Sequence, residues 1–363
     1  MKNMDGKERI SRILQRKDVD RIGLFEHFWG DTLKVWQSQG HIKENESLEN
    51  HFGFDMSIIW PFNYIANLDF TPQTIEEDEE TILQKDGNYA ILRKHKLHNA
   101  TPEHVDFTVR DRNGWEELIK PHLIDTKQDR KRINFQGYLE TKKMADQAGR
   151  FFCWAGINVF EQMHPICGHE YMLMGMALDP DWIKDMTKVL SDLNIRLMEI
   201  LFAECGKPDG IWFYEDMGYK EHPFMSPQMY DEIILSAHKK TFDFAHSIGL
   251  PVIVHSCGYV APLVPGLIKA GMDCLQVIEV KAGMDVLKLK KDFGDKIALC
   301  GGMDARNLVA NDINNIRKEL NEKIPILKKG SGYILHSDHS IPTDTKYETY
   351  KFFVSEGLRL GKY

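Results

Sequence analysis

Two short runs carry the groups best suited to hold a metal ion. His255 and Cys257 stand two residues apart, and His339 ends a second polar run over residues 336–339. Both side chains of the first run can face one ion if the backbone turns there, and Gly258 permits such a turn. Imidazole and thiolate donors suit zinc. The residues therefore predict a Zn²⁺ site of His255, Cys257 and His339, with one coordination position open.

Other assignments of these residues stay open. His255 could be a buried histidine bonded to backbone, and Cys257 an inert buried thiol. His339 could be a loop histidine that binds a substrate anion, in which case His336 is a substitute ligand. A fourth ligand could come from Glu215 or Asp216. A zinc ion with an open position acts as a Lewis acid that holds a thiol as thiolate or polarises an ether oxygen.

Polar residues also follow most of the apolar runs in the second half of the chain, where an α/β barrel places its reactive groups. We expect four of them to be catalytic: Glu215, Asp216, His336 and Asp338. Further polar and aromatic residues at comparable positions are candidates for substrate binding: His27, Phe28, Trp29, Asn63, Tyr64, Trp154, Tyr219, His222, Glu279 and Asp304. Trp60 belongs to the same group of candidate aromatic pocket residues, although packing alone could account for many of these rings.

The elements that must position these residues alternate regularly after residue 150. Apolar runs predict strands at 151–154, 210–214, 251–254, 274–277, 297–300 and 332–335. Helical segments follow at about 180–205, 226–248, 259–270, 284–293, 311–329 and 345–359. Two early runs, 22–25 and 56–60, bring the strands to eight. Strands alternating with helices pair in parallel, so the pattern predicts an α/β fold, a (β/α)8 TIM barrel; an open doubly wound sheet is the alternative.

One stretch breaks this alternation. Between about 67 and 125, two strand-like runs flank Asp86-Gly87-Asn88, a hairpin signal, and residues 105–109 could add a strand. We expect an antiparallel β-hairpin excursion from the barrel in the N-terminal third, within a single domain over 1–363. The charged stretch 126–148 should form an exposed helix.

The composition of the chain limits the partners and the cellular compartment that we expect for it. The net charge is −8, and no basic stripe with interleaved aromatics is present, which argues against a nucleic-acid partner. No apolar run reaches the roughly 18 residues of a membrane span. The six cysteines are scattered, unlike a disulfide framework. We expect a cytoplasmic protein that does not associate with membranes.

The runs Pro251–Tyr259, Gly271-Met272-Asp273 and Tyr333–Pro342, with Ser226-Pro227 and the segment 54–59, resemble the uroporphyrinogen decarboxylase superfamily. The resemblance covers about 8–60 and 150–360, and it implies the barrel fold. The decarboxylases of this superfamily work without a metal and carry an arginine-rich N-terminal segment and an aspartate after the second strand. This chain has Glu26-His27-Phe28-Trp29 and Trp60-Pro61-Phe62-Asn63 at those places.

The other branch of the superfamily contains the zinc methyltransferases of corrinoid systems. His255 and Cys257 match their His-x-Cys pattern, whereas His339 stands where the thiol-activating members have a cysteine. The resemblance implies methyl transfer between a small donor or acceptor (a methoxylated aromatic, a methylamine-type compound or a thiol) and a cobalamin-bearing corrinoid protein. An O- or N-demethylase fits this pattern at least as well as a thiol methyltransferase.

Two further functions compete with this one. The first is a metal-free decarboxylase of a different carboxylic acid, in which acidic residues and histidines protonate a carbanion. The second is a non-catalytic barrel that carries a corrinoid or tetrapyrrole. Zinc content and carbon dioxide release distinguish the methyltransferase from the decarboxylase. Equal ligand affinity of wild type and Cys257→Ser, with no turnover in either, would favour the carrier.

Overall fold

The centre of the molecule is a sheet of eight parallel strands. The computed structural model describes residues 4–96 and 102–363. Within them the strand order is β1-β12-β11-β10-β9-β8-β7-β2, so the sheet curls into a TIM barrel, as predicted. The strands are β1 (Gly23–Leu24), β2 (Met56–Ile59), β7 (Phe151–Ile157), β8 (Gly210–Tyr214), β9 (Val252–Ser256), β10 (Cys274–Val277), β11 (Ala298–Gly301) and β12 (Tyr333–Leu335).

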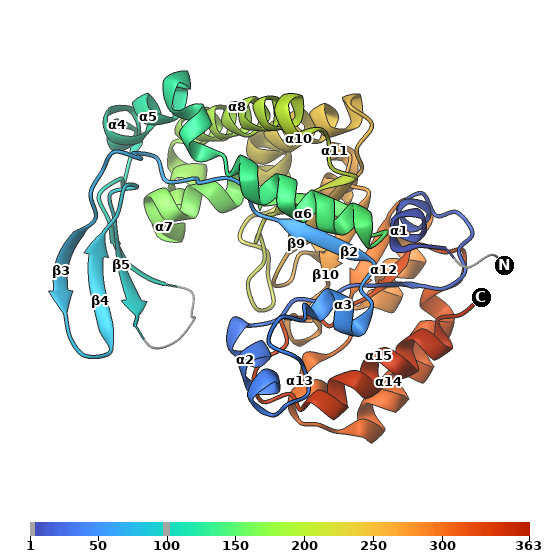
Figure 1. Cartoon of the computed structure of the whole chain (residues 1–363). Helices are drawn as coiled ribbons and strands as arrows, with labels where there is room; N and C mark the ends of the chain where they lie inside the picture. The colour runs from blue at the N-terminus through green and yellow to red at the C-terminus, as the bar shows by residue number, and fades with distance from the viewer. Residues whose placement is uncertain (1–3, 97–101) are drawn as a thin grey trace.

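Helices connect these strands and surround them (Figure 1). The six predicted helices are confirmed as α8 (Pro180–Cys205), α9 to α10 (Pro227–Met229 and Leu235–Ser247), α11 (Val264–Ala270), α12 (Val286–Phe293), α14 (Ile313–Leu327) and α15 (Tyr347–Leu360). Their starts follow ordinary capping chemistry: Asp179 accepts from the Trp182 N–H and Ser226 from the Met229 N–H, each before a first-turn proline. None of the helices in 4–96 and 102–363 is both long enough and apolar enough to cross a bilayer.

One long helix was not expected from the sequence. Helix α7 (Val159–Leu178) follows β7 directly and contains Pro165 and Gly168. Gly168 has a φ of 69°, which splits the helix into two segments at a kink. Proline and glycine are helix breakers, so the local pattern pointed away from a helix that packing on α8 stabilises.

The remaining α-helices of the described chain are α1 (Gly6–Leu14), α2 (Gly30–Ser38), α3 (Leu48–Phe52), α4 (Arg112–Gly114), α5 (Lys120–Ile124), α6 (Phe135–Gln147) and α13 (Ala305–Val309). Helix α6 accounts for most of the helix predicted over 126–148, and a 3-10 segment, Thr126–Arg132, precedes it.

The predicted excursion is a four-stranded antiparallel sheet, with strands β3 (Gln73–Glu77), β4 (Thr81–Lys85), β5 (Ala90–His95) and β6 (Glu103–Phe107) in that order. The hairpin forms at Asp86-Gly87-Asn88, where the Asp86 carbonyl accepts from the Tyr89 N–H at 2.9 Å. The sheet lies at the opposite side of the molecule from the two chain ends (Figure 1).

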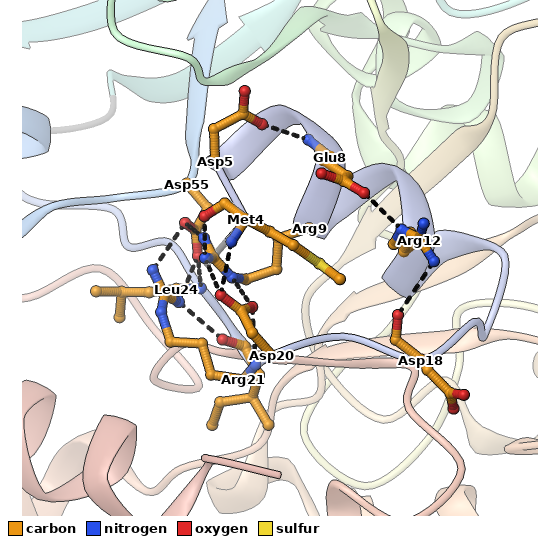
Figure 2. Close-up of polar contacts among 11 residues, drawn as sticks. Met4, Asp5, Glu8, Arg9, Arg12, Asp18, Asp20, Arg21, Leu24 and Asp55 are labelled. Carbon is orange, nitrogen blue, oxygen red and sulfur yellow. Dashed lines mark hydrogen bonds and ion pairs between the residues drawn. The ribbon is translucent and has the colours of Figure 1, made fainter. Parts of the chain in front are cut away.

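The first and last members of the barrel sheet, β1 and β2, are joined by an aspartate. Asp55 donates its N–H to the Leu24 carbonyl, and its carboxylate accepts from the Leu24 N–H at 2.8 Å. The same carboxylate binds Arg9 at 2.6 Å and Arg21 at 2.7 Å, and Arg9 also binds Asp20 at 2.7 Å (Figure 2). These four charged residues lie near the N-terminal ends of β1 and β2. We call Arg9, Asp20, Arg21 and Asp55 the floor cluster.

Candidate metal centre

Three side chains converge at the opposite end of the barrel. Asp216 lies two residues after β8, His255 is on β9 and Cys257 directly follows it. The Asp216 Oδ1 lies 3.3 Å from the His255 Nε2, and the Cys257 Sγ lies 3.3 Å from the same nitrogen. A ligand atom from each residue lies within 4.8 Å of the other two. We call these three residues the rim cluster.

The loop after β9 is shaped by two glycines. Gly258 has a φ of 77°, and a Cβ at this position would lie 2.3 Å from the backbone carbon of Gly218. Its N–H donates to the Glu279 carboxylate at 2.7 Å, and the Cys257 N–H donates to Asp216 at 2.8 Å. The turn expected at Gly258 is therefore present, and it returns the thiol toward His255.

Two of the three ligand separations in the rim cluster are those of a tetrahedral zinc site. Adjacent ligand atoms of a tetrahedral zinc ion lie roughly 3.3–3.6 Å apart, given bond lengths of about 2.0–2.3 Å. The two 3.3 Å separations at the His255 Nε2 fit this geometry. Thiolate, imidazole and carboxylate are the donors that zinc takes.

The electrostatics of the rim cluster favour positive charge. Burial lowers the pKa of His255, but the neighbouring Cys257 and Asp216 outweigh it and hold that pKa well above its usual value. Burial raises the pKa of Asp216, and the charge of His255 outweighs this effect, so the pKa is lowered. The carboxylate and the thiol thus favour the protonated, positively charged form of His255.

Below the rim cluster, the barrel interior holds a polar network. The His27 Nδ1 lies 2.9 Å from the His336 Nε2, and the His27 Nε2 lies 2.8 Å from the Tyr214 hydroxyl. The His336 Nδ1 lies 3.1 Å from the Glu26 carboxyl. Burial lowers the pKa of His336 to about 3 and raises that of Glu26 to about 8. The imidazole of His336 is therefore neutral and the carboxyl of Glu26 mostly protonated at neutral pH.

Of the four residues expected to be catalytic, Asp216 is in the rim cluster and His336 in the interior network. Glu215 and Asp338 have other partners. The Glu215 carboxylate accepts from the Phe160 and Glu161 N–H groups at the start of α7 and contacts His238 at 2.5 Å. The Asp338 carboxylate accepts from the N–H groups of Val280 and Ala305. Both acids fix loop and helix starts.

His339, the expected third ligand, is not in the rim cluster; the third member of that cluster is Asp216, considered above as a fourth ligand. The chain after β12 turns away because the Ile341 N–H donates to the His27 carbonyl and the Ile341 carbonyl accepts from the Trp29 N–H. The His339 ring lies 6.4 Å from the Trp29 ring. Both rings border a hollow of about 360 Å³ that also involves Arg306, Val309 and Pro342.

The aromatic residues expected to line one substrate pocket are dispersed. Phe28 packs against Trp36 and Tyr350, and Trp154 is fully buried beside Phe62 and Phe213. The Tyr64 hydroxyl is buried against Gly156, whereas Trp29 and Tyr219 are exposed.

Two aromatic rings lie on the side of His255, one from β8 and one from the residue that follows β2. The Tyr214 ring lies 4.5 Å from the His255 ring, and Trp60 lies 4.3 Å from Tyr214. Trp60 is 44% exposed, so part of its indole is free to contact a ligand. Tyr214 was not among the expected site residues.

The remaining polar candidates lie around the rim. Glu279 binds the Gly258 N–H, one residue from Cys257. Asn63 accepts from the Ile65 N–H in its own loop, and Asp304 caps α13 and pairs with Arg306. His222 is exposed, and its carbonyl accepts from the Tyr219 N–H. Among these, Glu279 has the most direct link to the rim cluster.

A parallel barrel with ionisable groups gathered past its strand ends is the arrangement of TIM-barrel enzymes. The family model "Uroporphyrinogen decarboxylase (URO-D)" matches residues 152–357, more than half of the chain. The chain therefore belongs to the uroporphyrinogen decarboxylase family. No curated protein matches the sequence significantly.

Among solved structures, a methyltransferase from Methanosarcina mazei is similar over 98% of each chain, with 15% identity and a TM-score of 0.69. The β-glycosidase from Thermosphaera aggregans is similar over 95% of this chain and 97% of its own, with 12% identity and a TM-score of 0.43. At 15% identity the similarity to the methyltransferase concerns the fold alone.

Proposed function

We propose that this protein is a zinc-dependent methyltransferase of a corrinoid system. It moves a methyl group between a small donor or acceptor and a cobalamin-bearing partner protein. The observation that carries this proposal is the convergence of the Asp216 carboxylate, the His255 imidazole and the Cys257 thiol past the strand ends. Membership of the family and the overall similarity to the Methanosarcina mazei methyltransferase support it.

Asp216, His255 and Cys257 would hold the zinc ion, and three protein ligands leave a fourth position for a substrate. When bound, zinc supplies Lewis acidity, which stabilises a thiolate or polarises an ether oxygen. The part-exposed Trp60 and Tyr214 offer aromatic surface beside this position. Such a surface can stack on a methoxylated ring or contact a methylammonium group.

The arginines near the first two strands argue against uroporphyrinogen as the substrate. A substrate with eight carboxylates needs cationic partners in its pocket. Arg9 and Arg21 instead belong to the floor cluster, where they bind Asp20 and Asp55. On the rim, Lys281 and Arg306 are paired with Glu279 and Asp304.

The test uses free cobalamin in place of the partner protein. Zinc-loaded enzyme is supplied with cob(I)alamin and, separately, a methoxylated aromatic, a methylamine and a methyl thioether; in the reverse direction it receives methylcobalamin and a thiol. We expect zinc-dependent interconversion of cob(I)alamin and methylcobalamin in at least one arm, followed by absorbance. Carbon dioxide release from candidate acids is measured in parallel on metal-free enzyme.

Cys257→Ser should abolish the zinc-dependent rate, whereas Cys205→Ser, which alters a part-exposed thiol outside the rim cluster, should not. Absence of methyl transfer in every arm, or equal rates with and without zinc, would overturn the proposal. Release of carbon dioxide by the metal-free enzyme would establish the decarboxylase alternative.

A further inference from the structure

Gln276 lies between the rim cluster and the interior network. Its side chain is fully buried on β10, whose register sets Gln276 beside His255 of β9. Neighbouring residues of a parallel pair point to the same face of the sheet, so both side chains enter the barrel. The Gln276 Oε1 is hydrogen-bonded to the His255 Nδ1, and the Gln276 Nε2 lies 3.3 Å from the His336 Nε2.

The amide can satisfy both neighbours in one orientation only. The His336 Nδ1 lies 2.5 Å from the Ser337 carbonyl, a group that only accepts hydrogen bonds. A neutral imidazole has one N–H, so this nitrogen carries the proton and the His336 Nε2 is an acceptor. The Gln276 NH₂ must therefore face His336.

The carbonyl end of the amide must then face His255. An amide oxygen only accepts hydrogen bonds, so the His255 Nδ1 carries a proton that it donates to Gln276. The lone pair of neutral His255 is left on Nε2, the atom 3.3 Å from both Asp216 and Cys257. A lone pair pointed at the other two ligands is what metal coordination needs.

We propose that Gln276 is a positioning residue of the metal centre: it fixes the tautomer and the ring orientation of His255 and thereby raises the affinity of the rim cluster for zinc. This inference rests on the zinc site of the proposed function. It also ties that site to the interior network, because the orientation of Gln276 depends on the proton of His336.

Removal of the hydrogen-bond partner of a metal-ligating histidine typically weakens metal binding about 10- to 100-fold. The test compares zinc dissociation constants of Gln276→Leu and Gln276→Glu with wild type, by competition with a chromogenic chelator. Gln276→Leu, which lacks an acceptor, should fall in that range. Gln276→Glu keeps an acceptor for His255 and should remain within about threefold of wild type.

Gln162→Leu is the matched control. Gln162 is also buried, and its amide donates to the Ile157 carbonyl at 3.0 Å, outside the contacts of the rim cluster. Its replacement removes a buried amide of the same size and should leave the zinc constant unchanged. If Gln276→Leu loses no more zinc affinity than Gln162→Leu, Gln276 does not position His255. The proposed zinc site would still stand in that case.

A second measurement does not depend on the folding of the Gln276 variants. In metal-free wild type labelled with ¹⁵N-histidine, at a pH where His255 is neutral, the spectrum should show His255 protonated at Nδ1. The His255 signal is assigned by its loss in His255→Ala. Protonation at Nε2 would overturn the inference, and wild type that binds no zinc would overturn both it and the proposed function.

Discussion

The two ends of the barrel treat ionisable side chains in opposite ways. In the floor cluster, two guanidinium groups form three ion pairs with two carboxylates, each at 2.6–2.7 Å. In the rim cluster, a carboxylate and a thiol share a single imidazole. The floor cluster is balanced by its own residues, whereas the rim cluster gains by taking up a cation. We therefore assign a structural role to the floor cluster and propose a binding role for the rim cluster.

The carboxyl groups show the same contrast. At the floor, burial of Asp20 is outweighed by the hydrogen bonds of Arg9 and of two backbone N–H groups, which bring its pKa to about 2. In the interior below the rim, burial raises the pKa of Glu26 to about 8, against weaker opposing hydrogen bonds from Ser337 and His27. One acid is thus charged and the other mostly neutral at pH 7.

The largest effect is expected at the floor. Asp55→Ala leaves Arg9 and Arg21 without a shared carboxylate and opens the junction of β1 and β2, so it should cost about 3–5 kcal/mol of unfolding free energy, measured in urea. Asp5→Ala, an exposed cap of α1, should cost only about 1 kcal/mol. Comparable losses in the two variants would remove the structural role assigned to the floor cluster.

At the rim cluster we expect a large effect on zinc binding and a small effect on folding stability. Cys257→Ser removes a thiolate ligand, so zinc affinity should fall by more than about 100-fold, while the metal-free protein keeps its stability within about 1 kcal/mol. Zinc titration and urea unfolding of the same preparations separate the two quantities. A large loss of stability without a change in zinc affinity would place Cys257 with the packing residues instead.

The buried Glu26 gives a pH dependence of defined sign. Its folded pKa of about 8 lies above the ordinary 4.5, so the folded state holds an extra proton between these values. Stability from this group is complete below pH 4.5 and is lost as the pH rises toward 8, at up to about 1.4 kcal/mol per pH unit. Glu26→Gln should flatten this part of the profile of unfolding free energy. A profile identical to that of wild type would show that Glu26 is ionised in the folded protein.

The smallest effect is expected for His339. Because its ring lies beside Trp29 and outside the rim cluster, His339→Ala should change the zinc dissociation constant by no more than about twofold, against the much larger losses typical of true ligands. Asp216→Asn is the variant to compare with His339→Ala, and it should weaken zinc binding strongly. The opposite ranking would restore His339 as the third ligand.

Much of the fold could be predicted because the strand-helix alternation after residue 150 is regular and its strands are apolar. The predicted strand at Gly210–Tyr214 and the predicted helix at Pro180–Cys205 have the observed bounds. Helix α7 was missed because Pro165 and Gly168 interrupt the local pattern that tertiary packing overrides.

The site could be predicted only in part. His255 and Cys257 stand two apart in the sequence, so their proximity is local. Whether Asp216 or His339 comes near His255 and Cys257 depends on how the loops after β8 and β12 turn. The spacing of residues along the sequence does not determine these turns. Gln276 was overlooked, although a polar residue inside the apolar strand Cys274–Val277 is a signal that the strand faces other polar groups.

The central claim is tested most directly by X-ray absorption at the zinc edge of the loaded wild-type protein. The account predicts one sulfur at about 2.3 Å and the remaining nitrogen and oxygen ligands at about 2.0–2.2 Å, with a single imidazole contribution. The sulfur should disappear in Cys257→Ser. Zinc held without sulfur, zinc held by two imidazoles, or no stoichiometric zinc would contradict it.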